Sequence, residues 1–156
     1  MKVFIGADHR GVDFKKKIIS ILERYGYTVE DEGTFDQSVS CDYPIVAYKV
    51  CTSVATNPGS RGILMCMSGI GQSIAANKVP GILAALVLNK EMAALSRQHN
   101  NANVLVLSAK FTKEDELENI IKAWMTTEFE GGRHERRIEL IEQIEKGIAP
   151  DEVIEE

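Results

Sequence analysis

Five short strand-like runs alternate along the chain with longer segments, and this alternation is the feature that most limits the possible folds. The runs are Val3–Gly6, Tyr27–Glu30, Gly62–Cys66, Ile82–Leu88 and Asn103–Leu107. The segments between them are long enough to carry crossover helices, so parallel βαβ units are favoured. The sequence therefore predicts an α/β fold, a three-layer αβα sandwich built on a five-stranded parallel Rossmann-like sheet.

Six helices are expected between and after these runs. Their ranges are Gly11–Tyr25, Pro44–Val54, a helix that follows the loop after Cys66 and runs to Lys78, Lys90–Gln98, Thr112–Thr127 and His134–Lys146. In the first helix the apolar residues recur at helical spacing with lysines on the other face, and Gly26 is placed to end it. Thr112, followed closely by Asp115 and Glu116, predicts a capping box at the start of the fifth.

The composition is that of an ordinary globular protein, with 44% of its 156 residues hydrophobic and 26% charged. We expect one domain over residues 1–146 and an acidic tail at 147–156. The net charge of −5 argues against a nucleic-acid surface, and no apolar stretch approaches the roughly 20 residues that cross a membrane. The three cysteines lack paired spacing and the N-terminus does not read as a signal peptide, so a reduced, cytoplasmic protein is expected.

Polar and titratable residues follow several of the predicted strands. They are Asp8–Gly11, Cys66–Gly71, Asn89–Lys90 and Ser108–Lys110. Ligands bind beyond the carboxyl ends of strands in open parallel sheets, so these segments should meet at one edge. Asp8 also fits a helix N-cap beside an exposed His9, which accounts for Asp8 alone. Core packing does not explain so many polar groups at one edge.

The loop after the third strand combines a thiol with small residues. Cys66 is followed by Met67-Ser68-Gly69-Ile70-Gly71 and then by a helix. Amides at the start of a helix favour anions, and a thiolate stabilised there is a useful base. A lone cysteine is more often a small buried hydrophobic residue. Its place before this loop favours the catalytic interpretation.

Three other anion-binding loops are excluded by groups that this one lacks. A P-loop needs Gly-Lys-Ser/Thr, but Gly71 is followed by Gln72-Ser73. A dinucleotide fingerprint would place Gly where Ile74 stands, and would follow the first strand. A cysteine phosphatase loop would need Arg six positions after Cys66, where Gln72 stands.

Two more groups lie near the later helices. His99 and Asn100 end a helix, where Asn100 or Asn101 in a left-handed conformation would serve simply as a cap. Arg133 and Arg137 follow a glycine pair and share one helix face. They form either a solvated basic face or, as the glycine pair favours, a phosphate site. The histidines and Cys66 lack the spacing of zinc ligands, so no metal is predicted.

In order and in detail, these motifs closely resemble those of the ribose-5-phosphate isomerase B family, which includes allose- and galactose-6-phosphate isomerases. The matching segments are Asp8-His9-x-Gly11, Asp42-Tyr43-Pro44, the stretch from Cys66 to Lys78, Leu95-Ser96-Arg97-Gln98-His99-Asn100, Asn103-Val104-Leu105 and Glu130-Gly131-Gly132-Arg133-His134-x-x-Arg137. The resemblance implies an isomerase that interconverts D-ribose 5-phosphate and D-ribulose 5-phosphate through an enediolate, with no cofactor or metal. A hexose-6-phosphate isomerase of the same family is the near alternative. A non-catalytic sugar-phosphate sensor is the alternative from another class.

The resemblance also implies roles for individual residues. Cys66 would carry the proton between C2 and C1, while Ser68 and the amides from Met67 to Gly71 would stabilise the enediolate oxygen. His99, with His9 and Asp8, would assist ring opening. The other substrate contacts would come from Tyr43, Gly69, Ile70, Asn100, Lys110, Arg133 and Arg137, with the two arginines on the phosphate. The site would be shared between the subunits of a homodimer, often paired into a tetramer.

The chain departs from the usual family pattern at several positions. Met67 stands where most relatives have Gly, and its side chain adds bulk near the substrate. Ser68 replaces the common Thr, and Lys110 stands where an Arg often helps to bind phosphate. One branch of the family uses Glu at the position of Gln72 as its base. Because Gln cannot accept that proton, the role falls to Cys66.

Overall fold

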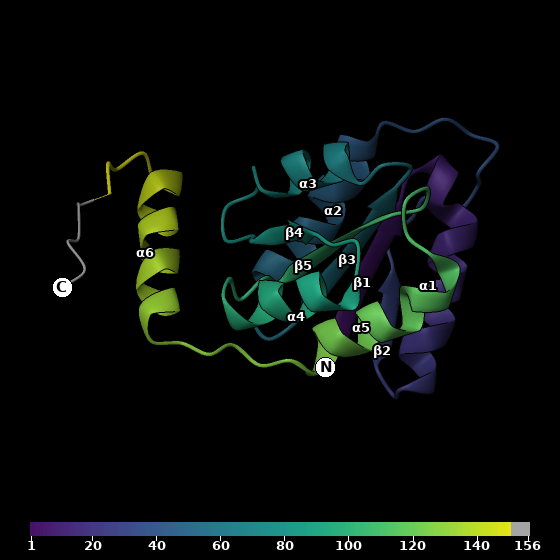
Figure 1. Ribbon diagram of the computed structural model, residues 1–156. Helices are drawn as coiled ribbons and strands as arrows, with labels where there is room; N and C mark the ends of the chain where they lie inside the picture. The colour runs from purple at the N-terminus through teal and green to yellow at the C-terminus, as the bar shows by residue number, and fades with distance from the viewer. Residues whose placement is uncertain (151–156) are drawn as a thin grey trace.

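The structure, a computed structural model that describes residues 1–150, contains a five-stranded parallel sheet (Figure 1). The strand order is β2-β1-β3-β5-β4. The strands are β1 Lys2–Ala7, β2 Thr28–Asp31, β3 Arg61–Cys66, β4 Ala84–Leu86 and β5 Val104–Ser108. Each predicted run holds one strand, although β4 is shorter than expected. The predicted α/β fold with a five-stranded parallel sheet is confirmed.

Helices cover both faces of this sheet. They are α1 Val12–Arg24, α2 Tyr43–Thr56, α3 Ile70–Ala76, α4 Lys90–Gln98, α5 Leu117–Thr126 and α6 Arg133–Glu145, with short 3-10 turns η1 His9–Gly11 and η2 Glu114–Glu116. One core cluster joins the sheet to α1, α4 and α5, and the other joins it to α2 and α3. Two apolar clusters on opposite faces of one sheet make the predicted three layers.

Two local expectations about the helices are wrong. Lys15 does not lie on a solvated face of α1: it is buried, and its ammonium group donates to Asp31 Oδ1 at 2.8 Å and to the Thr34 carbonyl at 2.6 Å. Thr112 forms no capping box, because its buried hydroxyl has no hydrogen-bond partner and the chain enters a 3-10 turn before α5. Both outcomes depend on tertiary neighbours that helical periodicity does not reveal.

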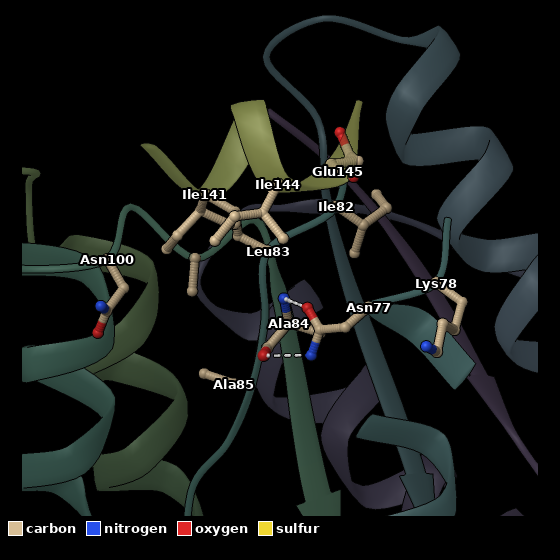
Figure 2. Close-up of a pocket in the computed structure, with 11 residues that line it drawn as sticks. Asn77, Lys78, Ile82, Leu83, Ala84, Ala85, Asn100, Ile141, Ile144 and Glu145 are labelled. Atoms are coloured by element: carbon tan, nitrogen blue, oxygen red, sulfur yellow. Dashed lines mark hydrogen bonds between the residues drawn. The ribbon is translucent and has the colours of Figure 1, made fainter. Parts of the chain in front are cut away.

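The last helix, α6, stands apart from the helices that flank the sheet, at the end of an extended segment after α5 (Figure 1). It contacts the turn before β4, where the Gly81 N–H lies 3.2 Å from Glu145 Oε1. Figure 2 shows Ile141 and Ile144 of this helix beside Leu83, bordering a pocket. The predicted acidic tail extends beyond the described residues, which end at 150. Among residues 1–150, no helix has the length and apolar character needed to cross a membrane.

Candidate active site

The end of β1 carries the first two predicted site residues. Asp8 Oδ1 accepts from the backbone N–H groups of Arg10 and Gly11 at 3.1 and 3.2 Å, so Asp8 is the N-cap that the sequence predicted. His9 Nδ1 accepts from the Cys41 N–H at 3.2 Å. A neutral ring with Nδ1 as acceptor carries its proton on Nε2. The loop that contains Cys41 thereby fixes which nitrogen of His9 can donate.

Cys66 lies at the end of the central strand β3, next to that turn. Ala7 pairs with Met65 in the sheet register, which brings Asp8 alongside Cys66. The thiol is 6% exposed, and its Sγ accepts from the Gly69 N–H at 3.2 Å. The expected meeting of the β1 and β3 segments at one edge therefore occurs.

The loop after Cys66 is held by bonds within itself and to β5. Ser68 Oγ accepts from the Ile70 N–H at 3.2 Å, so this amide and that of Gly69 are both engaged inside the loop. The Met67 carbonyl accepts from Ser108 Oγ at 2.7 Å and from the Lys110 N–H at 3.0 Å. These bonds carry Lys110 to the same edge as Cys66.

Gly71 packs against Tyr43, a contact that the sequence did not reveal. A Cβ at position 71 would lie 2.5 Å from Cζ of the Tyr43 ring. Tyr43 begins α2 and Gly71 lies in the first turn of α3, so the contact joins the starts of two helices. Tyr43, predicted to bind substrate, is thus placed beside the thiol loop. Ile70 also lies there and is 56% exposed.

The other predicted site residues lie at the opposite, amino end of the sheet. His99 is the C-cap of α4, which returns to the start of β5, and Asn100 follows it. At this end the Gly62 N–H of β3 donates to the Asn103 carbonyl at 2.9 Å. Arg133 begins α6 near His99, because the Glu130 N–H donates to the Gln98 carbonyl at 3.1 Å. Arg137 lies one turn further along α6. The predicted left-handed cap is Asn101, with φ of 47°.

His99 belongs to a cluster with His134 and Glu130. The two imidazole rings stack with centroids 4.3 Å apart and planes 13° from parallel, and His134 Nε2 lies 3.5 Å from Glu130 Oε2. These three residues are of metal-binding type and their ligand atoms lie within 4.8 Å of one another. The lone pair of an imidazole nitrogen lies in the ring plane, so one ring must turn before both can bind a single ion. The observed arrangement is a stack that orients His99.

Two further arginines, Arg97 and Arg61, also lie towards the amino end of the sheet. Arg97 is buried and donates to the Ala102 carbonyl at 2.7 Å. Burial, and secondarily Arg61, lowers the pKa of Arg97 to about 10, which leaves it charged at neutral pH. Arg61 in turn donates to the Trp124 carbonyl at 2.9 Å.

The predicted site is thus divided into two halves within one chain. The carboxyl-end half holds Asp8, His9, Tyr43, Cys66, Met67, Ser68, Gly69, Ile70, Gly71 and Lys110. The amino-end half holds His99, Asn100, Arg133 and Arg137. A parallel strand rises about 3.3 Å per residue, so six-residue β3 separates the two halves by roughly 16 Å. One protomer does not bring the halves together.

A parallel sheet with a thiol and a small-residue loop at its carboxyl edge places this chain among open α/β proteins, in which ligands bind beyond the carboxyl ends of the strands. The family model described as Ribose/Galactose Isomerase matches residues 3–141. Ribose-5-phosphate isomerase B of Escherichia coli is 41% identical over 145 residues, which cover 93% of this chain and 97% of that protein. The chain belongs to the ribose/galactose isomerase family, as its motifs predicted.

Solved structures agree with this assignment. Ribose-5-phosphate isomerase B of Clostridium thermocellum is 45% identical with a TM-score of 0.91, covering 94% of this chain and 99% of that one. The Mycoplasma genitalium protein, solved with bound ribulose-5-phosphate, is 44% identical with a TM-score of 0.89, covering 93% and 96%. The shared fold includes the strands and loops that place Cys66.

Proposed function

We propose that this protein is a cytoplasmic aldose–ketose isomerase that interconverts D-ribose 5-phosphate and D-ribulose 5-phosphate. The observation that carries the proposal is the position of the Cys66 thiol at the end of β3. Its sulfur accepts a hydrogen bond from the Gly69 N–H, and His9 follows the neighbouring strand β1. The Mycoplasma genitalium relative, which was solved with ribulose-5-phosphate, supports this choice of substrate.

Cys66 serves as the base in this mechanism. With the sugar open, Sγ takes the proton from C2, and the electrons of that C–H bond form the C1=C2 double bond of an enediolate while O1 gains negative charge. The thiol returns the proton to C1, the O2 proton passes to O1, and O2 becomes the carbonyl oxygen. Ser68 Oγ, which is positioned by accepting the Ile70 N–H, and the loop amides of Met67, Ser68 and Gly71 stabilise the enediolate oxygen as fixed donors. No cofactor enters this sequence of steps.

Ring opening and phosphate binding fall to the amino-end half of the site. His99, oriented by its stack with His134, moves the proton between the ring oxygen and the anomeric hydroxyl. Arg133 and Arg137 hold the phosphate through charge-assisted bonds, with Lys110 adding charge from the carboxyl end. Asn100 contacts the sugar hydroxyls.

The separation of the two halves supports a homodimer. Two copies related by a two-fold axis can place the amino-end half of one against the carboxyl-end half of the other. Helices α2 and α3 also expose apolar side chains that a partner would cover, namely Ile45, Tyr48, Ile70 and Ile74. We propose that each active site is built from both subunits of this dimer.

A six-carbon substrate is the second candidate, since the description of the matching family includes galactose as well as ribose. Comparing kcat/KM for ribose 5-phosphate, allose 6-phosphate and galactose 6-phosphate separates the two. A sensor without activity would bind these sugars but would not exchange the C2 proton with solvent deuterium.

Replacement of the thiol tests the mechanism directly. Cys66→Ala should lower kcat on ribose 5-phosphate by about 10²–10⁴-fold, the usual contribution of a general base. Cys51→Ala is the matched control, because Cys51 lies buried in α2 between apolar side chains. It should keep activity within a few-fold of wild type. Cys66→Ala activity within tenfold of wild type would rule out the thiol as base.

A further inference from the structure

Met67 brings a large, flexible side chain into a loop otherwise rich in small residues. It lies between Cys66 and Ser68, and 42% of it is exposed. Its Sδ accepts a hydrogen bond from Arg10 Nη1 at 3.2 Å. Arg10 directly follows His9, so this contact crosses from the end of β1 to the end of β3.

Both ends of this bridge have anchored backbones. The Met67 carbonyl is held by Ser108 and Lys110. The Arg10 N–H is held by the Asp8 carboxylate. Because both backbones are held in this way, the Met67 and Arg10 side chains meet over the ends of β1 and β3.

We propose that the Met67–Arg10 bridge selects substrates by length, admitting five-carbon sugar phosphates and disfavouring six-carbon ones. The inference rests on the proposed function. With C2 fixed at Cys66 and the phosphate fixed at the arginines, a hexose 6-phosphate must fit one more carbon with its hydroxyl between them. Met67 directly follows Cys66 and contacts Arg10, so their bridge borders the side of the thiol towards which the longer sugar would extend.

Substitution of Met67 tests the proposal by a ratio. The measured quantity is kcat/KM for allose 6-phosphate divided by kcat/KM for ribose 5-phosphate. Met67→Gly should raise this ratio by about tenfold or more, since one carbon in a fitted pocket is typically worth 10–200-fold. Met67→Leu keeps most of the bulk but loses the sulfur that Arg10 contacts, so it should raise the ratio by a smaller factor than Met67→Gly. Arg10→Ala should raise it by a smaller factor than Met67→Gly.

A second measurement separates failure of this inference from failure of the proposed function. Dissociation constants for the same two sugar phosphates are measured by calorimetry on proteins that also carry Cys66→Ala. A wild-type protein without activity on ribose 5-phosphate would overturn the proposed function, and the binding ratio would still report selection by length. If Met67→Gly leaves both the kcat/KM ratio and the ratio of dissociation constants within threefold of the same protein with Met67, the proposal that the bridge selects by length is wrong.

Discussion

Because Gly71 has no side chain, the ring of Tyr43 can pack directly against its backbone. A Cβ there would lie 2.5–2.9 Å from the outer atoms of the Tyr43 ring, which is 41% exposed and can swing away. Alanine is also the better helix former by about 1 kcal/mol. Gly71→Ala should therefore leave the free energy of unfolding almost unchanged, while displacement of Tyr43 raises the KM for ribose 5-phosphate by roughly tenfold, or about 1.4 kcal/mol.

A double-mutant cycle provides the control for this prediction. In a Tyr43→Ala background the ring is gone, so Gly71→Ala should change KM by less than about twofold. Additive effects of the two substitutions on KM would show that Gly71 acts by another route.

Cys51 should make the free energy of unfolding fall as the pH rises into the alkaline range. Burial raises the pKa of this fully buried thiol to about 12, whereas an unfolded cysteine has a pKa of ~8.5. A raised pKa gives a contribution that is complete below the unfolded value and is lost as pH rises towards the folded one. Between pH 8.5 and 10.5 the free energy of unfolding of wild type should fall by roughly 2–3 kcal/mol more than that of Cys51→Ala.

Urea denaturation with a reducing agent at pH 7.5, 8.5, 9.5 and 10.5 measures this difference. Ionisation of tyrosine and lysine affects both proteins and cancels in the comparison. Parallel pH curves for the two proteins would contradict the assignment to Cys51.

For individual residues, the sequence predicts position best where the course of the backbone alone decides it. Cys66 and Asp8 were placed correctly because strand ends in a parallel sheet share an edge. The contact of Arg10 with Met67 joins residues 57 positions apart through side-chain directions that no local pattern encodes. Only the folded chain reveals it.

Among the secondary-structure elements, Lys15 connects helix α1 with strand β2 and with the loop that follows β2. From α1 its ammonium group reaches Asp31 at the end of β2 and the Thr34 carbonyl beyond it. Asp31→Ala removes the counter-charge and should cost about 3 kcal/mol of unfolding free energy, because a buried ammonium loses its partner. Lys15→Met replaces the charge with an apolar chain of similar length and should cost less. Denaturant unfolding of both variants checks this order, and the reverse order would contradict it.

The elements were predictable to different degrees. Strands β1 and β3 came close to their predicted ranges, since a buried parallel strand is apolar on both faces. The predicted helix at Thr112–Thr127 instead begins with the turn Glu114–Glu116, and α5 starts at Leu117. Leu117, the first residue of α5, is buried in the core, whereas Glu114, Asp115 and Glu116 are not.

At the scale of the whole molecule, the division of the site was not readable from the motif positions alone. Helices α4 and α5 run back along the sheet, so residues that follow them return to the amino end. The sequence predicts His99 and Arg133 as members of one site with Cys66. Only the topology shows that they lie a strand length away from Cys66 in the same chain.

This division predicts that two inactive proteins can restore activity together. In a dimer of one Cys66→Ala chain and one Arg133→Ala chain, one site takes both substitutions and the other takes neither. Heterodimers purified by two different tags should therefore show about half of wild-type activity per dimer, whereas each homodimer stays nearly inactive. If each active site were built within one chain, both sites of the heterodimer would carry one substitution, and the heterodimer would be as inactive as the homodimers. A second pair, Cys66→Ala with His99→Ala, should behave alike, since His99 lies at the same end as Arg133.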